Sequence, residues 1–375
     1  MKALFVLSGI ASVILFTPYG KDFFFRGGFR WLYVLLFSAS LSFFIVPAVR
    51  LIAIRFKMID IPAERKVHAE PTPLLGGLAV YLGTVSAFLS NQIVDDQSLS
   101  ILSSGAILVL VGVINDKREI PASIRLLIQI AITFFIIKSG VLLTLFPSES
   151  VFGASVNIFL TILWVVGITN SMNFFDGMDG LASGLSIITA FFIGIIAFMG
   201  AQPILGWMAI AILGASLGFL PYNFRIKGPA TIFLGESGST FLGFILSALA
   251  IKGEWSENNP LVSLTAPLLI FSIFIYDTIY ITVARVIEGK VKSVKEWIDY
   301  VGKDHLHHRM DALLQGKKKA VILIYFLAIS LGLTALLIRR VTTEMAIILI
   351  LQAVVILGVV TILEREGNKR IKNVE

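Results

Sequence analysis

Residues 181–199 read LASGLSIITAFFIGIIAFM and contain no charged side chain. A helix needs about 20 mostly apolar residues, within a range of roughly 17–25, to cross the hydrocarbon core of a bilayer. The stretch is long enough, and its apolar residues do not alternate at every second position as those of a membrane barrel strand would. It therefore predicts a transmembrane helix.

The composition of the whole chain agrees with this reading. Of 375 residues, 57% are hydrophobic and 15% are charged, against about 45–50% apolar and about 25% charged residues in soluble domains. These values exclude a water-soluble enzyme, a disordered protein and a coiled coil. The absence of cysteine excludes a disulfide framework, a zinc finger and a thiol nucleophile.

Apolar stretches of similar length recur along the chain and predict an all-α polytopic integral membrane protein with about 11–12 transmembrane helices. We expect a single domain over residues 1–375, with a motif-bearing core at about 50–310. The stretch 3–18 also has the character of a signal-peptide core, but a poor cleavage site follows it, so we expect an extra N-terminal helix there. The twelve predicted spans lie near residues 3–18, 31–54, 74–90, 101–114, 124–146, 156–169, 181–199, 204–220, 233–250, 261–283, 320–338 and 345–363.

Basic residues predict the orientation in the membrane. If the loop 55–73 and every alternate loop lie on one side, that side holds 24 of the 31 Lys and Arg residues and the other side holds 7. Basic residues accumulate in cytoplasmic loops, so the first side and both termini are expected in the cytoplasm. The same bias explains the net charge of +7 without a nucleic-acid partner. The longest extramembrane stretch, about 284–319, is expected there too, with a short amphipathic helix.

The polar residues with unusual spacing also fall in the predicted cytoplasmic loops or at the adjoining ends of the spans. A transporter typically places such groups at the bilayer midplane. Their position at the inner surface instead indicates a soluble cytoplasmic substrate that meets a lipid-embedded one. The set comprises His68, His305, His307, His308, Asn115, Asp116, Asn170, Asn173, Asp176, Asp179, Asn223 and Glu236.

The densest of these segments is NSMNFFDGMDGLA at 170–182. If it is helical, Asp176 and Asp179 share one face with Cβ atoms about 5–6 Å apart. Carboxylates that close repel each other unless a cation lies between them, and hard oxygen ligands suit Mg²⁺ or Mn²⁺. The alternative is a helix N-terminal cap, where Asp and Asn are favoured anyway.

Three further segments carry polar groups of interest. In RKVHAEPTPLLGG at 65–77, cations precede a glycine pair that could hold phosphates through backbone N–H donors; the alternative is an ordinary positive-inside anchor. In HLHHR at 305–309, the histidines and Arg309 could donate to pyrophosphate oxygens. Residues 232–240 read as a helix start with Glu236 in its first turn, and Asp277 is an intramembrane ionisable residue.

Five motifs in this order resemble the polyprenyl-phosphate N-acetylhexosamine-1-phosphate transferase family. They are RKxH…P…GG at 65–77, an Asp-Asp-like pair at 115–116, NxxNxxDGxDGLA at 170–182, LGxxGS at 234–239 and HxHHR at 305–309. The HLHHR form is similar to the bacterial undecaprenyl-phosphate GlcNAc-1-phosphate transferase branch.

The resemblance implies a reaction and its partners. Sugar-1-phosphate, expected to be GlcNAc-1-phosphate, moves from a UDP-N-acetylhexosamine to undecaprenyl phosphate and UMP is released, as the first membrane step of cell-envelope glycan synthesis. The implied cofactor is Mg²⁺, with Mn²⁺ as a substitute. The implied location is the bacterial cytoplasmic membrane, with the active site facing the cytoplasm among membrane lipids. A homodimer is common among such enzymes, although no GxxxG seam argues for one here.

The resemblance also assigns roles to residues. The implied metal ligands are Glu236, Asp176 and Asp179. The implied catalytic residues are Asp116, Asp176, Asp179, His305, His307 and His308. The implied substrate-binding residues are Lys66, His68, Asn115, Asn170, Asn173, Asn223 and Arg309.

Two positions depart from the family pattern. Family members usually have Asp-Asp where this chain has Asn115 and Asp116, and usually have Asp where it has Glu236. An asparagine has no titratable carboxylate and cannot act as a base. Either Asp116 carries the work alone or the enzyme is weakened.

Two other classes of protein fit the residues less well. CDP-alcohol phosphotransferases also pair Asp with Gly near a membrane, but their signature continues with Ala-Arg, whereas Gly177 is followed here by Met178 and Asp179. A secondary transporter of a phosphorylated solute would require internal repeats and midplane charges, and apart from Asp277 neither is visible.

Overall fold

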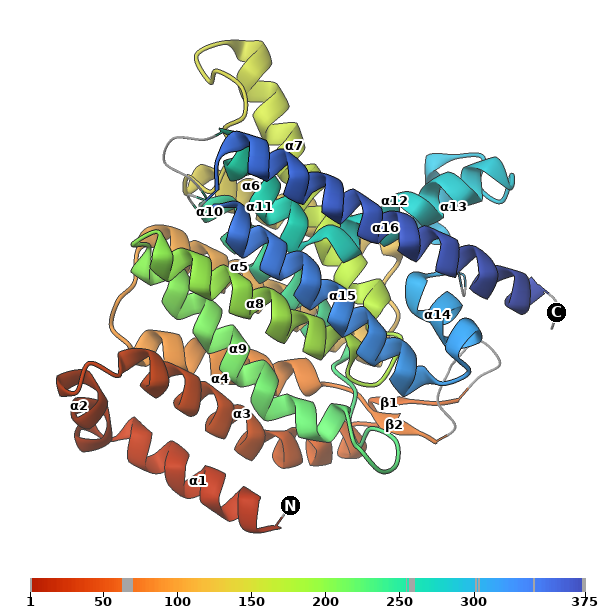
Figure 1. Ribbon diagram of the computed structural model, residues 1–375. Helices are drawn as coiled ribbons and strands as arrows, with labels where there is room; N and C mark the ends of the chain where they lie inside the picture. The colour runs from red at the N-terminus through yellow and green to blue at the C-terminus, as the bar shows by residue number, and fades with distance from the viewer. Residues whose placement is uncertain are drawn as a thin grey trace. The chain divides into compact units, whose positions relative to one another are not determined.

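The structure is a computed structural model that describes residues 2–62, 70–253, 255, 260–300, 302, 304–339 and 341–372. Lys66 and His68, two of the predicted substrate-binding residues, lie outside the described residues. The chain folds into two compact units, residues 1–253 and residues 254–375. Each unit is built almost entirely from helices (Figure 1).

The first unit contains ten helices and one short antiparallel ladder among its described residues. In the ladder, Ile59 pairs with Pro73 and Asp60 with Thr72. Helix α9 packs against both α3 and α8, and α4 packs against both α3 and α9 (Figure 1). The elements are α1 (Lys2–Phe16), α2 (Pro18–Arg26), α3 (Arg30–Arg55), β1 (Ile59–Asp60), β2 (Thr72–Pro73), α4 (Gly76–Ser90), α5 (Asp96–Lys117), α6 (Ala122–Lys138), α7 (Val151–Phe175), α8 (Leu181–Met199), α9 (Pro203–Asn223) and α10 (Gly235–Lys252).

Helix α10 forms the core of the first unit. Every residue from Ser237 to Ile251 is buried, and α4, α5 and α7 all pack against it. Small residues permit this close packing: a Cβ added at Gly112 would lie 2.3 Å from the Cα of Ser237. Small residues at crossings are the usual way for membrane helices to approach closely, because lipid supplies no hydrophobic driving force between them.

Helices α5 and α10 run antiparallel, and a polar contact joins them at each end. At one end, Lys252 Nζ lies 2.6 Å from Asp95 Oδ2. At the other end, the backbone N–H of Glu236 donates to Asp116 Oδ1 at 3.0 Å. The second contact brings two of the predicted motifs together at the start of α10.

The second unit contains six helices among its described residues. Helix α14 packs against α15 and α16, and α11 packs against α15. The short helices α13 and α14 lie in the stretch 284–319, where a short helix was predicted. The elements are α11 (Pro260–Ile270), α12 (Ser272–Ile287), α13 (Val294–Asp299), α14 (Leu306–Leu314), α15 (Lys317–Ile338) and α16 (Thr343–Lys372).

The predicted class, an all-α polytopic membrane protein, is confirmed. Each of the twelve predicted spans coincides with a helix, or in the case of 261–283 with the bent pair α11 and α12. Among the described residues, seven helices are long and apolar enough to cross a membrane, or nine if each bent pair counts as one span. This number is below the predicted 11–12 because α4 and α6 have only 15 and 17 residues and α10 begins with the polar sequence GESGST.

Candidate active site

The Asp116 carboxylate lies against the first turn of α10. Asp116 is near the end of α5, and its Oδ1 accepts the backbone N–H of Glu236 at 3.0 Å while its Oδ2 accepts the hydroxyl of Ser237 at 3.2 Å. The first N–H groups of a helix have no partner within the helix and carry partial positive charge, so they stabilise a carboxylate. Asp116 is therefore fixed in place by the α10 N-terminus.

Gly235 makes this approach possible. Its φ of +75° is in the left-handed region, and a Cβ at this position would lie 2.6 Å from Asp116 Oδ2. Glycine alone adopts this φ without a steric penalty. Glycine is thus needed before Glu236 for a structural reason, the close approach of Asp116, that the sequence did not reveal.

Asn115 and Glu236, the two departures from the family pattern, are hydrogen-bonded to each other. Asn115 Nδ2 donates to Glu236 Oε2 at 2.6 Å, and Asn115 Oδ1 accepts the backbone N–H of Ile120 at 2.8 Å. The second bond fixes the orientation of the amide, because a flipped amide would turn its NH₂ toward another N–H. Glu236 Oε2 also forms an ion pair with Arg125, which lies in α6.

The glycine pair at 76–77 packs against the segment before α10. The N–H of Gly76 donates to the carbonyl of Phe233 at 3.0 Å, and that of Gly77 donates to the carbonyl of Leu234 at 2.8 Å. A Cβ at Gly77 would lie 2.1 Å from the Cα of Gly238. These N–H groups are used within the protein, so in this structure the pair serves helix packing and does not offer the phosphate donors that the sequence suggested.

Asp176 and Asp179 lie in a turn between α7 and α8. Helix α7 ends at Phe175 and α8 begins at Leu181, so the helical spacing considered for the two carboxylates does not occur. Asp179 Oδ2 accepts the backbone N–H of Ala230 at 2.8 Å, and Gly180 has a φ of +80°, which ends the turn. A double Asp-Gly sequence is typical of a turn, because glycine adopts positive φ readily.

The electrostatics around Asp176 suit a cation. Burial raises the pKa of the Asp176 carboxyl well above its ordinary value, and the negative charges of Asp116, Asp179 and Asp60 raise it further, against the lowering by the Gly235 backbone N–H. A divalent cation at this position would offset the repulsion between Asp176 and these neighbouring carboxylates.

The predicted three-residue metal site is not assembled, however. Among the residues that the structure describes, no group of three or more His, Asp or Glu side chains is arranged to hold a metal ion. Asp179 is turned toward Ala230 and Glu236 toward Arg125. The assignment of Asp176, Asp179 and Glu236 as metal ligands stays a prediction.

The other three predicted asparagines connect elements of the first unit. Asn170 Nδ2 donates to Gln129 Oε1 at 2.6 Å, and Asn173 Oδ1 accepts the hydroxyl of Ser239 at 3.1 Å. Buried Asn223 accepts the N–H of Gly180 at 3.0 Å and donates to the carbonyl of Ile232 at 3.2 Å. Asn223 therefore connects the 176–180 turn with the segment leading into α10.

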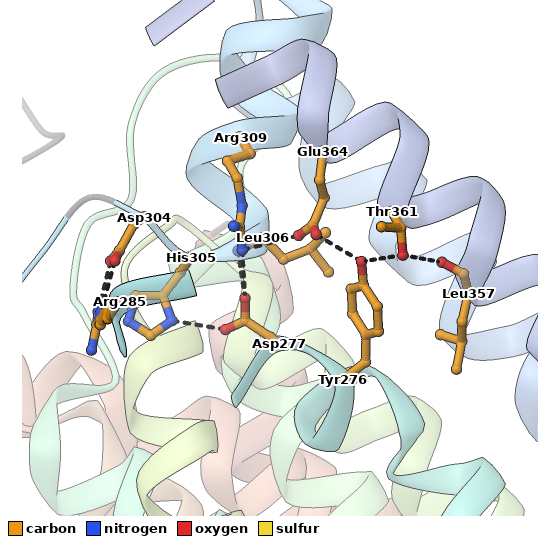
Figure 2. A network of polar contacts seen from close by, with 10 residues as sticks. All are labelled: Tyr276, Asp277, Arg285, Asp304, His305, Leu306, Arg309, Leu357, Thr361 and Glu364. Carbon is orange, nitrogen blue, oxygen red and sulfur yellow. Dashed lines mark hydrogen bonds and ion pairs between the residues drawn. The ribbon is translucent and has the colours of Figure 1, made fainter. Parts of the chain in front are cut away.

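In the second unit, the histidine segment surrounds Asp277 (Figure 2). Asp277 lies in α12, and its Oδ2 is 2.7 Å from His305 Nδ1 while its Oδ1 accepts the N–H of Leu306 at 2.7 Å. A carboxylate on Nδ1 fixes the tautomer and the ring orientation of a histidine. The sequence indicated Asp277 as an intramembrane ionisable residue but not its partner.

Arg309 is buried between two carboxylates. Its Nη2 lies 3.3 Å from Asp277 Oδ1 and 3.1 Å from Glu364 Oε1, and its side chain is 2% exposed. The guanidinium also lies over the ring of Tyr280, with 4.4 Å to the centroid. These contacts fit a residue that holds the segment together better than one that meets a substrate phosphate.

The remaining histidines differ in their surroundings. Burial lowers the pKa of His307 well below its ordinary value, and the neighbouring His308, His305 and Arg309 lower it further, so His307 is neutral at pH 7. His308 is half-buried, whereas His305 and His307 are buried. Preceding them, Asp304 receives two hydrogen bonds from Arg285 at 2.6 and 2.7 Å.

Sequence reasoning missed Arg125, Gln129 and Glu364. Arg125 was counted only as a cytoplasmic charge, and Gln129 and Glu364 were not considered. A charged side chain beside an apolar run was the available signal for Glu364, since buried charges in membrane proteins are almost always paired.

Comparisons with known proteins give the same family as the motifs. The model of glycosyl transferase family 4 matches residues 98–254, which include Asp116, the 170–182 segment and Glu236. The chain is 31% identical to a probable undecaprenyl-phosphate N-acetylglucosaminyl 1-phosphate transferase of Bacillus subtilis, over 88% of this chain and 90% of the relative. It is 32% identical to a decaprenyl-phosphate N-acetylglucosaminephosphotransferase of Mycolicibacterium smegmatis, over 77% of both chains. It is also 29% identical to the undecaprenyl-phosphate alpha-N-acetylglucosaminyl 1-phosphate transferase of Escherichia coli, over 73% of this chain and 74% of the relative.

Proposed function

The chain belongs to the polyprenyl-phosphate N-acetylhexosamine-1-phosphate transferase family, and from this we propose that it transfers GlcNAc-1-phosphate from UDP-GlcNAc to undecaprenyl phosphate. An oxygen of the lipid phosphate forms a bond to the β-phosphorus of the nucleotide sugar. The bond between the β-phosphorus and the oxygen that it shares with the α-phosphorus breaks. UMP leaves with that oxygen. The products are a lipid-linked pyrophosphoryl sugar and UMP.

One observation carries this proposal. The 31% identity extends over 90% of a relative whose name states this reaction, so nearly the whole relative is covered. Such a reaction starts cell-envelope glycan synthesis at a membrane, and the apolar helices of this chain make it a multi-pass membrane protein. A transporter and a CDP-alcohol phosphotransferase do not account for this match.

Catalysis of phosphoryl transfer consists mainly of positioning and charge stabilisation. We propose that Asp116, fixed by the α10 N-terminus, orients the acceptor phosphate. A phosphate monoester has a second pKa near 6 and is mostly ionised at pH 7, so a strong base is dispensable. Asn115 and Arg125 then serve to hold Glu236 in place.

Members of this family generally depend on a divalent metal, and we propose Mg²⁺ here. The carboxylate of Asp176, with those of Asp116 and Asp60 close enough to repel it, fits such an ion. Asp179 and Glu236 could join, since a carboxylate has two oxygens and the contacts described above for each involve one of them. When bound, the metal would neutralise phosphate charge during transfer.

The histidine segment supplies the remaining donors in this proposal. Asp277 orients the His305 ring through Nδ1, and we propose that this imidazole contacts a phosphate oxygen. His308 is the most accessible of the three histidines and could donate likewise. We further propose that the whole chain acts as one transferase domain with its phosphate-handling residues on the cytoplasmic side.

A direct assay tests the proposal. Purified protein is incubated with undecaprenyl phosphate and, one at a time, a panel of UDP-sugars, while UMP release and the lipid product are both measured. We expect UMP and a lipid-linked product in equal amounts with UDP-GlcNAc. Absence of UMP release with every sugar, from a protein that remains folded, would contradict it.

A further inference from the structure

Helix α16 lies against helix α14 along one of its sides. Glu364 Oε1 is 3.1 Å from Arg309 Nη2, a Cβ at Gly367 would lie 2.2 Å from the backbone oxygen of Arg309, and Arg370 Nη1 donates to the carbonyl of Leu313 at 2.9 Å. Residues three positions apart lie on the same face of a helix. One face of α16 therefore carries an ion pair, a glycine contact and a hydrogen bond to α14.

The ion pair in this face is fully enclosed. The side chains of Arg309 and Glu364 are 2% and 0% exposed, and Glu364 Oε2 also accepts the hydroxyl of Tyr276 at 2.7 Å. A charge persists away from water only when it is paired and hydrogen-bonded. Glu364 is thus one of two carboxylates in the described residues that balance the Arg309 guanidinium, and Asp277 is the other.

The two carboxylates connect Glu364 with His305. Asp277 is shared, because it contacts Arg309 and also accepts from His305 Nδ1 and the N–H of Leu306 (Figure 2). Without the charge of Glu364, Asp277 would be the one described carboxylate left to pair with the Arg309 guanidinium. The guanidinium would then compete with His305 for the same carboxylate.

We propose that Glu364 is a positioning residue for the histidine segment 305–309, acting through Arg309 and Asp277. It lies in the C-terminal helix, outside the core that the motifs mark. The inference rests on the proposed function insofar as the histidines serve sugar-phosphate transfer. Its structural part, the anchoring of α14 by α16, holds independently of any substrate.

The kinetic test compares charge variants on one helix. Glu364→Gln removes the charge at nearly constant shape, and we expect kcat to fall by at least about tenfold while KM for UDP-GlcNAc changes less than about threefold. Glu364→Asp keeps the charge and should recover part of the lost kcat. Glu366→Gln is the matched control, because Glu366 is exposed and pairs with exposed Lys369, and it should behave as wild type. A Glu364→Gln enzyme with wild-type kcat would overturn the proposal.

A second measurement is independent of activity. Met310 is buried in α14 and the chain contains no cysteine, so a Met310→Cys variant reports the anchoring of α14 by its rate of maleimide labelling. Adding Glu364→Gln should raise that rate at least about tenfold, and adding Glu366→Gln should not. Unchanged labelling would overturn the anchoring even if transfer is found, whereas an inactive wild type with the expected labelling would refute only the proposed function.

Discussion

Asn115 and Glu236 depart from the family pattern at two positions that touch each other. A carboxylate at position 115 would face the carboxylate of Glu236, and like charges at hydrogen-bond distance repel. An amide at 115 instead donates to Glu236 at 2.6 Å. Each departure therefore suits the other, which favours an intact site over a weakened one.

The contact leads to a prediction for Asn115→Asp. The substitution removes the donor and adds a negative charge beside Glu236, so we expect the initial rate of transfer to fall by at least about tenfold. Hydrogen bonds to charged groups contribute about 1.5–3 kcal/mol, which corresponds to a loss of this size. The sequence alone left open whether Asp116 acts alone or the enzyme is weakened, because the partner of Asn115 was unknown.

A compensating variant provides the control for this prediction. In Asn115→Asp combined with Glu236→Gln, the pair again has one acid and one amide, and Arg125 again has an acidic neighbour. Because Glu236 is also a proposed metal ligand, the coupling is measured from the thermal midpoint, and recovery of the midpoint relative to Asn115→Asp alone would confirm it. If Asn115→Asp instead raises the rate, the site is a weakened one and the interpretation of the pair is wrong.

At the scale of helices, the contact between α4 and α10 depends on glycine. In Gly77→Ala, the new Cβ would lie 2.1 Å from the Cα of Gly238, so the two helices must separate and the start of α10 moves with them. We expect a lower thermal midpoint and a loss of activity of at least about tenfold, since a misplacement of about 1 Å can cost about 10²-fold in rate.

Gly167→Ala is the matched control for this prediction. Gly167 lies in α7, and an added Cβ there would have no neighbour within 4 Å. We expect its midpoint to stay within about 2 °C of wild type, because a substitution away from any contact changes stability by only a few tenths of a kcal/mol. Equal midpoints for the two variants would contradict the packing role of Gly77.

Helix positions could be predicted from the sequence because apolar length alone specifies them. A helix, or a bent pair of helices, lies at every predicted span. The bend between α11 and α12 could not be predicted from the apolar run 261–283. The ends of the helices depend on local backbone conformation. At 176–180 a helical spacing of the two aspartates was considered, but the Asp-Gly repeat forms a turn, as glycine and aspartate favour. Composition predicted the helices, whereas backbone conformation fixed their ends.

Candidate site residues were recognised by type, but their partners were not. Asp116 and Asp277 were singled out from the sequence as carboxylates at unusual positions. Their contacts with the α10 N-terminus and with His305 involve residues 120 and 28 positions away in the chain, so the sequence alone did not show them. From the sequence alone, Arg125 and Glu364 cannot be distinguished from ordinary surface charges. Only the folded chain shows that each is paired with a residue of a motif.

For the whole enzyme, we predict dependence on a divalent cation. Chelation with EDTA should abolish transfer, and Mg²⁺ or Mn²⁺ should restore it. Asp176→Asn should lower the rate at least about 10²-fold, the scale of removing one well-placed charge stabiliser. Asp22→Asn is a control, because Asp22 is an exposed carboxylate and should behave as wild type. Full activity in EDTA would refute the metal assignment.

The orientation of the whole chain follows from its charges, since 24 of the 31 Lys and Arg residues fall in loops predicted to share one side. Single cysteines in this cysteine-free chain test it with an impermeant thiol reagent. Lys227, Lys318 and Glu149 are exposed positions. The Lys227→Cys and Lys318→Cys variants should be labelled only after the cells are permeabilised, whereas Glu149→Cys should be labelled in intact cells, because basic loops are retained in the cytoplasm. External labelling of Lys227→Cys would refute the orientation and would also deprive the α10 N-terminal region of access to a cytoplasmic UDP-sugar.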